Sequence, residues 1–219
     1  MTFLNKRYIL MDLDGTITDP AIGITKSVQY ALEHFDIIVN ELSLLYPFIG
    51  PPLKKSFIEY YHLTDKQADC AITKYREYFS EKGIYENEVY DKMGLFLETC
   101  RKQDKELIVA TSKPTLFAEK ILRHFHIRDY FTAVYGSNLD GTRSDKNEVI
   151  QYALSSQEII NKDEAIMIGD RKHDIEGASK NKINSIGVLY GYGSREELTK
   201  AGADELAENI SQLQKLITG

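Results

Sequence analysis

Two carboxylates stand directly after the first apolar run of the chain, where they are well placed for chemistry. Asp12 and Asp14 follow the run 8–11, and in a continued strand their side chains share one face. Neighbouring buried carboxylates repel each other and lose hydration, so a cation stabilises both. Oxygen ligands favour Mg²⁺, a hard ion that also binds phosphate oxygens. Gly15 lets the backbone turn and approach a ligand, although an Asp-Gly pair alone is also typical of an ordinary turn.

A hydroxyl and an ammonium group follow a second apolar run, 107–110. Ligands of an open α/β sheet bind at the carboxyl ends of its strands, so Thr111 and Lys113 are expected near the ligand. Both groups donate hydrogen bonds and suit a phosphate. We interpret Ser112, which lies between them, as the N-cap of the following helix.

A third apolar run, 165–168, also ends in acidic residues. Asp170 is expected at the strand tip, and Asp174 one helical turn further on. The alternative interpretation is an acidic N-cap followed by a solvated first turn. Acidic residues after two separate runs, together with the hydroxyl and ammonium after another, favour one shared site over independent caps.

The elements that must position these residues are read from apolar runs and helical stripes. Continuous apolar runs are typical of strands buried on both faces, and they occur at 8–11, 107–110, 165–168 and 186–189, with a weaker one at 132–135. Helical patterns follow Pro114, Asp145, Asp174 and Ser194. The alternation of strand and helix from Glu106 onward predicts a parallel α/β sheet with right-handed crossovers.

The stretch between the first run and the rest of the sheet has a different pattern. Apolar residues recur there at helical spacing from Ile24 to Phe35, further helix-like segments follow at 53–61 and 66–81, and no strand-like run is present. We therefore predict an α/β core domain of residues 1–18 and 89–219 and an inserted helical domain of residues 19–88.

The composition limits the class of protein. The chain has 219 residues, of which 42% are hydrophobic, and its formal net charge is −6. The acidic balance counts against a nucleic-acid polymer as partner, and no apolar run is long enough for a membrane span. We expect a cytoplasmic protein in which Cys70 and Cys100 are free thiols.

These motifs together resemble the haloacid dehalogenase (HAD) superfamily, in its phosphatase branch, over essentially the whole chain. Residues 12–16 match the DxDGT signature, the run ending in Thr111 matches a second motif, and residues 169–174 match GDxxxD. The resemblance is greatest to the phosphoglycolate phosphatase and nucleotidase-like group. It implies a Rossmann-like three-layer α/β core with a parallel sheet, and a small all-helical cap of type 1 inserted after the first motif.

The resemblance also implies roles. Asp12 is then the nucleophile that forms an aspartyl-phosphate, and Asp14 is the general acid and base. Thr111 hydrogen-bonds the phosphoryl oxygens. Mg²⁺ is held by Asp12, the backbone carbonyl of Asp14, and Asp170, with Asp174 orienting a metal-bound water.

The remaining contacts to the phosphorylated group are less constrained by the pattern. The superfamily uses a lysine before a helix, often next to prolines, and the corresponding stretch here offers Arg143 or Lys146. We predict Lys146, because a compact ammonium suits the role better than a forked guanidinium. Lys113, Gly15 and, from the cap, Gly50 are predicted to contact substrate.

The function predicted from this resemblance is Mg²⁺-dependent hydrolysis of a small phosphomonoester, either phosphoglycolate-like or nucleotide-like. A phosphomutase or pyrophosphatase of the same superfamily is the alternative, since neither is separated by these motifs. A receiver-like signalling module fits less well, because receivers are shorter and lack the first motif and the insertion. A non-catalytic binding protein fits poorly with both Asp12 and Asp14 present. The expected partner is a small phosphorylated metabolite, and the sequence leaves the oligomeric state open.

Overall fold

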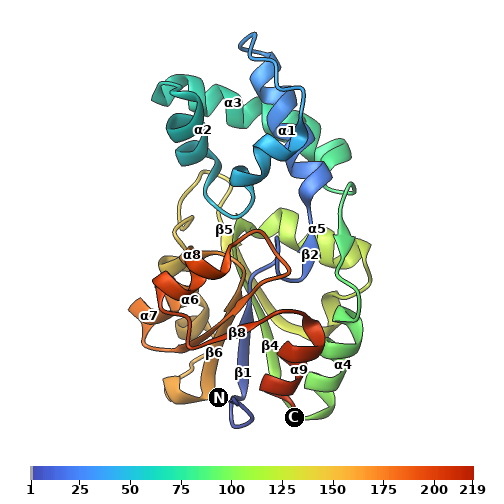
Figure 1. Cartoon of the computed structure of the whole chain (residues 1–219), viewed down its shortest axis with the longest axis vertical. Helices are drawn as coiled ribbons and strands as arrows, with labels where there is room; N and C mark the ends of the chain where they lie inside the picture. Colours follow the sequence, from blue (N-terminus) through green and yellow to red (C-terminus); the bar gives the residue numbers. More distant parts are fainter. Residues whose placement is uncertain (1) are drawn as a thin grey trace. The chain divides into compact units, whose positions relative to one another are not determined.

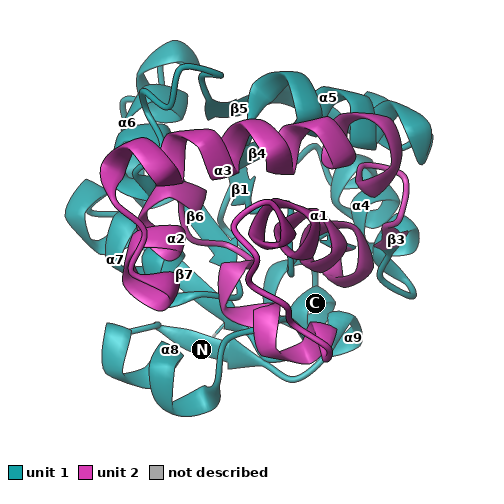
Figure 2. Cartoon of the chain, turned by 90° about the horizontal axis from the view of Figure 1, so that it is seen from above, with its two compact units in different colours: residues 1–18, 89–219 teal, residues 19–88 magenta. Residues whose placement is uncertain are grey.

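The computed structural model describes residues 2–219, and the chain divides into two compact units. Unit 1 is Met1–Thr18 with Val89–Gly219, and unit 2 is Asp19–Glu88 (Figure 2). Two short strands, β2 (Thr18–Asp19) and β3 (Glu88–Val89), pair with each other. Both divisions between the units fall inside these strands, so the chain crosses from one unit to the other only in this two-stranded ribbon.

Unit 1 is built on a six-stranded parallel sheet in the order β5-β4-β1-β6-β7-β8 (Figure 1). The sheet's strands are β1 (Tyr8–Met11), β4 (Glu106–Pro114), β5 (Phe131–Ser137), β6 (Ala165–Gly169), β7 (Asn184–Val188) and β8 (Glu205–Ala207). The central strands β1 and β6 are almost entirely buried, as expected of a parallel sheet covered on both faces.

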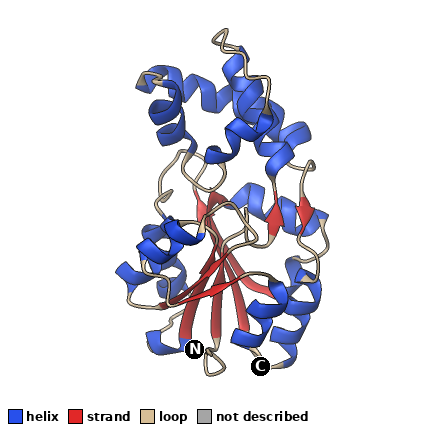
Figure 3. Cartoon of the chain, in the orientation of Figure 1, coloured by secondary structure: helices blue, strands red, loops and turns tan. Residues whose placement is uncertain are grey.

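Helices cover both faces of this sheet (Figures 1 and 3). One face packs against α6 (Lys146–Ser156) and α7 (Lys172–Asn181), with α8 (Arg195–Ala201) on α7. The other packs against α4 (Met93–Lys102) and α5 (Thr115–His124), and α9 (Ile210–Ile217) lies on α4. The apolar stripes of α6 and α7 meet β1, β4 and β6 in one buried cluster that includes Leu10, Ile108 and Val149.

Unit 2 is helical, apart from its ends in the ribbon. It contains α1 (Ala21–Glu33), a 3₁₀ segment (Leu42–Phe48), α2 (Leu53–Tyr61), α3 (Asp65–Tyr78) and a π-helical turn (Phe79–Gly83). Thr64 and Gln67 form a reciprocal capping box that starts α3. Aromatic side chains fill its interior, with Phe48 and Phe57 edge to face at 5.0 Å.

The predicted fold class, a parallel α/β core with a helical insertion, is confirmed. One strand was missed by the sequence analysis, and one local expectation is wrong. Strand β8 was not expected, because it has only three residues and begins with a glutamate. Ser112 is not an N-cap, because β4 continues to Pro114 and α5 begins at Thr115. None of the described helices is long and apolar enough to cross a membrane.

Candidate active site

The first strand ends one residue before the DxDGT segment. Strand β1 stops at Met11, and the ladder adds one bond beyond it, from the amide of Asp12 to the carbonyl of Ile168 (2.9 Å). The backbone then turns at Gly15, whose φ of 83° lies in the left-handed region that favours glycine. Asp12 and Asp14 are therefore loop residues at the carboxyl edge of the sheet, and both are buried.

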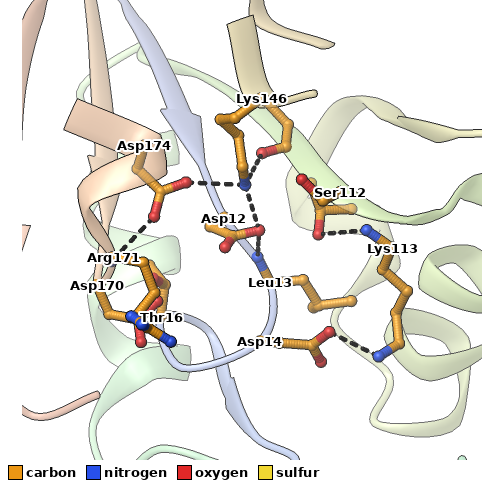
Figure 4. A network of polar contacts seen from close by, with 12 residues as sticks. Asp12, Leu13, Asp14, Thr16, Ser112, Lys113, Lys146, Asp170, Arg171 and Asp174 are labelled. Carbon is orange, nitrogen blue, oxygen red and sulfur yellow. Dashed lines mark hydrogen bonds and ion pairs between the residues drawn. The ribbon is translucent and has the colours of Figure 1, made fainter. Parts of the chain in front are cut away.

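A buried lysine joins two of the carboxylates (Figure 4). Lys146 Nζ lies 2.8 Å from Asp12 Oδ1 and 2.8 Å from Asp174 Oδ1, and it donates to the carbonyl of Ala110 (3.1 Å). The side chain of Asp145 caps α6 by accepting from the amide of Asn147 (2.8 Å), which makes Lys146 the first helical residue. Burial lowers the pKa of Lys146, but the two carboxylates outweigh it and hold the pKa above its ordinary value.

Arg143, the alternative to Lys146, lies outside this cluster. Its φ of 53° places it in the turn before α6. Its Nε donates to the carbonyl of Gly136 (3.0 Å), and its guanidinium stacks 3.9 Å from the ring centre of Tyr152. The structure therefore brings Lys146, and not Arg143, to the aspartates; what Lys146 does there remains a prediction.

Three carboxylates converge on a point that suits a metal ion. Asp12, Asp170 and Asp174 each offer an oxygen within 4.8 Å of the others, and all three are buried. Burial, with the charges of Asp174 and Asp12 added, raises the pKa of Asp170 well above its ordinary value. With Lys146 as partner, the three carboxylates still carry two uncompensated negative charges when ionised. An oxygen-lined, doubly negative cluster fits a hard divalent cation such as Mg²⁺.

The segment Gly191–Gly193 packs directly against Asp170, a contact that the sequence analysis did not predict. The amide of Tyr192 donates to Asp170 Oδ2 at 2.8 Å. A Cβ on Gly191 would lie 2.4 Å from Asp170 Cβ, and one on Gly193 would lie 1.9 Å from the Asp170 carbonyl oxygen. The two glycines two residues apart after β7 were the available signal, since they indicate close backbone approach.

Asp14 takes a different partner. Its Oδ2 lies 2.6 Å from Lys113 Nζ, so its carboxylate contributes nothing to the Asp12, Asp170 and Asp174 cluster (Figure 4). The predicted metal contact of Asp14, through its backbone carbonyl, remains a prediction. Burial raises the pKa of Asp14 above its ordinary value, and Lys113 opposes that rise. Thr111 lies beside them, 2% exposed, and its Oγ1 accepts from the amide of Lys113 (3.2 Å).

The predicted substrate contacts fall in different places. Gly15 lies against Asp170, because a Cβ added to Gly15 would come within 2.2 Å of Asp170 Oδ2. Lys113 lies at Asp14, as described above. Gly50 belongs to unit 2, where its φ of 100° requires a glycine in the turn before α2. Lys54, the next cation along the chain, pairs with Asp65 and Asp69 inside unit 2.

Comparisons with known proteins agree with this arrangement of motifs. Residues 9–188 match the model of the family described as haloacid dehalogenase-like hydrolase. The chain is 44% identical over 209 residues to a protein of Pseudomonas aeruginosa named 5'-nucleotidase, covering 95% of this chain and 94% of that protein. It is 34% identical over 211 residues to Tyrosine-protein kinase PtkA of Mycobacterium tuberculosis, covering 95% of this chain and 72% of that protein.

A solved structure extends the likeness to three dimensions. The crystal structure of a predicted phosphatase from Clostridium acetobutylicum is 52% identical to this chain, with a TM-score of 0.94. The match covers 96% of this chain and 97% of that one. The likeness thus spans both units as well as the residues that form the buried site.

Proposed function

Because the chain belongs to the haloacid dehalogenase-like hydrolase family and is a phosphatase of that family, we propose that it hydrolyses a small phosphomonoester with Mg²⁺ through an aspartyl-phosphate on Asp12. One observation carries the proposal. Asp12 is paired with the ammonium of Lys146 and belongs to the metal-competent cluster of carboxylates, while Asp14, two residues on, is engaged separately by Lys113. One carboxylate is thereby placed beside an ammonium and within a candidate metal site, both of which suit a phosphate, and the other is left for proton transfer.

The reaction divides into two transfers. A carboxylate oxygen of Asp12 attacks phosphorus, and the bond to the leaving oxygen breaks as Asp14 gives that oxygen a proton. Asp14 then takes a proton from a water molecule, whose oxygen attacks the phosphorus of the aspartyl-phosphate. The bond between phosphorus and the Asp12 oxygen breaks, phosphate leaves, and both side chains return to their starting states.

The cations stabilise the negative charge that spreads over the phosphoryl oxygens during each transfer. Lys146 is fixed by two carboxylates and a carbonyl, so it needs no reorganisation when charge develops beside Asp12. The Thr111 hydroxyl, at the same edge of the sheet, is proposed to donate to a phosphoryl oxygen. Mg²⁺, when bound to Asp12 and Asp170, supplies charge neutralisation and orients the phosphoryl group for in-line attack.

The substrate class is proposed from the relatives. The protein named 5'-nucleotidase is 44% identical to this chain, and a Phosphoglycolate phosphatase of Colwellia psychrerythraea is 24% identical. Nucleoside 5'-monophosphates therefore come first among the substrates to test, and phosphoglycolate second. We assign substrate selection to residues 19–88, which the chain inserts between β1 and the other core strands, with Gly50 as the proposed contact.

The test is phosphate release from nucleoside 5'-monophosphates, phosphoglycolate, sugar phosphates and pyrophosphate, with Mg²⁺ and with a chelator. The parent is expected to release phosphate only with Mg²⁺, and Asp12→Asn is expected to release none, because an amide cannot form the acyl phosphate. An Asp129→Asn variant is the matched control, since it makes the same change at an exposed position away from the cluster. Equal activity of Asp12→Asn and the parent would refute the proposed nucleophile.

Two further arms separate the alternatives. A phosphomutase releases little phosphate and needs a bisphosphate activator, so phosphate release without activator counts against it. The likeness to a protein named tyrosine-protein kinase calls for an arm with ATP and a tyrosine peptide. Phosphopeptide formation at a rate above that of phosphomonoester hydrolysis would overturn the assignment as a phosphatase.

A further inference from the structure

We propose that Lys113 is a positioning residue that acts through Asp14: it holds Oδ2, and thereby makes Oδ1 the oxygen that exchanges a proton with the leaving group. This inference rests on the proposed function and replaces the substrate contact expected of Lys113 from the sequence. It assigns a role to one lysine and to one oxygen atom of Asp14.

The contact between the two side chains is short, charged and buried. Lys113 Nζ lies 2.6 Å from Asp14 Oδ2, and the side chains are 6% and 9% exposed. A charge-assisted hydrogen bond of this length fixes the carboxylate more firmly than a neutral one. Burial removes the competing water that weakens such pairs at a surface.

The backbone that carries Lys113 is itself anchored. Its amide donates to Thr111 Oγ1 (3.2 Å), and the carbonyl of Ser112 accepts from Ser137 Oγ (2.8 Å). On the C-terminal side of Lys113, Pro114 is in register with Ser137 of the neighbouring strand β5. The lysine therefore extends from an irregular end of β4 whose backbone is held on both sides, which suits a residue that must hold another in place.

The second carboxylate oxygen of Asp14, Oδ1, has no hydrogen-bond partner among the described residues. Oδ1 is buried, and no group among residues 2–219 donates a hydrogen bond to it. A buried acceptor left without a donor has lost its hydration without compensation and is destabilising. The arrangement is explained if the missing partner arrives with the substrate, as a leaving oxygen that shares a proton with Oδ1.

The chemistry of the ammonium group determines where that proton sits. A lysine ammonium has three donors and no acceptor, so a proton on Oδ2 would point at another N–H. Protonated Asp14 therefore carries its proton on Oδ1. When the phosphorus–oxygen bond breaks, the leaving oxygen keeps the electron pair and takes this proton, and Oδ1 later takes a proton from the attacking water. Lys113 keeps all its protons throughout.

The experiment compares leaving groups in single-turnover reactions, which measure departure of the leaving group alone. 4-Nitrophenolate leaves without a proton, whereas an alkoxide needs one. Lys113→Met is expected to slow release from an alkyl phosphate by on the order of 100-fold, and release from 4-nitrophenyl phosphate only a few-fold. Asp14→Asn should show the same pattern. The double variant should be no slower than Asp14→Asn, because the lysine acts through the aspartate.

Controls keep a folding defect apart from a positioning defect. Lys120→Met makes the same substitution at an exposed site on α5 and should match the parent. Lys113→Arg, which keeps a positive donor, should recover part of the alkyl phosphate rate. If Lys113→Met does not fold, Lys113→Gln carries the same comparison.

Three results overturn the inference while leaving the phosphatase intact. An equal loss on both leaving groups indicates a structural role. Multiplying losses in the double variant indicate that Lys113 acts independently of Asp14. A raised KM confined to substrates with a second anionic group indicates a substrate contact. A parent that hydrolyses neither compound nor any phosphomonoester of the panel refutes the proposed function and this inference with it.

Discussion

Removing the ammonium of Lys146 tests whether the buried site is held together by charge pairing. The side chain of Lys146 is 3% exposed, and those of Asp12 and Asp174 are 4% and 1% exposed. Lys146→Met keeps an unbranched apolar stem and removes the ammonium, together with its two ion pairs and its hydrogen bond to the carbonyl of Ala110. In metal-free protein, the variant leaves three buried carboxylates with no cation among them.

The loss of folding stability in Lys146→Met can be estimated from the burial of the ion pairs that Lys146 makes with Asp12 and Asp174. Breaking a buried ion pair by removing one partner costs about 3–5 kcal/mol, because the charge left behind has lost its water. For a chain of this length each kcal/mol corresponds to about 2–4 °C in melting temperature. We therefore expect Lys146→Met to melt about 6–20 °C below the parent in the presence of a chelator.

Magnesium provides the second arm of the same experiment. The ion adds two positive charges beside the carboxylates that lost their lysine, so Mg²⁺ should raise the melting temperature of Lys146→Met more than that of the parent. Differential scanning fluorimetry with chelator and with Mg²⁺ measures both effects. Lys180→Met, at an exposed site of α7, is the control for the substitution itself. A Lys146→Met variant that melts within about 2 °C of the parent in chelator refutes the reasoning.

Two other perturbations test the same cluster. Gly15→Ala forces a Cβ to within 2.2 Å of Asp170 Oδ2 at a φ of 83°. The variant should lower the free energy of unfolding in urea by more than about 1 kcal/mol and weaken Mg²⁺ binding in calorimetry. Gly94→Ala, where a Cβ meets nothing within 4 Å, is the control and should do neither. Burial raises the pKa of Asp174 to about 6 in the folded protein. Protonation of this carboxyl therefore stabilises the metal-free folded state at a pH below the pKa of the unfolded chain, and the stabilisation is lost as the pH rises through about 6. The free energy of unfolding of the parent, relative to Asp174→Asn, should thus fall by about 3 kcal/mol between about pH 4 and pH 7; a flat or rising difference contradicts it.

The framework of the site could be predicted because it depends on local sequence. Short runs of apolar residues identify the buried strands β1, β4 and β6, and ligand-binding residues of a parallel sheet lie where such strands end. Asp12, Thr111 and Asp170 are consequently found at one edge. The family expected from these motifs is confirmed by the match over residues 9–188.

The choice between Lys146 and Arg143 shows where such prediction stops. Both residues lie in the same polar stretch, and spacing alone allows either to reach the site. The outcome depends on the helix beginning at Lys146, after the cap formed by Asp145, and on the stacking of Arg143 on Tyr152. The cap is encoded locally, but the contacts of Lys146 with Asp12, Asp174 and Ala110 form only after distant segments have packed.

The pairing of charges was the least predictable feature, and it changes the physical picture of the first motif. The sequence predicts one shared cation for two carboxylates that lie two residues apart. In the folded chain each has its own ammonium: Lys146 from α6 at Asp12, and Lys113 from β4 at Asp14. The Asp12–Lys146 pair includes a carboxylate of the metal-competent cluster, whereas the Asp14–Lys113 pair includes none. In the proposed reaction, these separate partners leave Asp12 at the metal-competent cluster to attack phosphorus and leave Asp14 one unpaired oxygen for the proton.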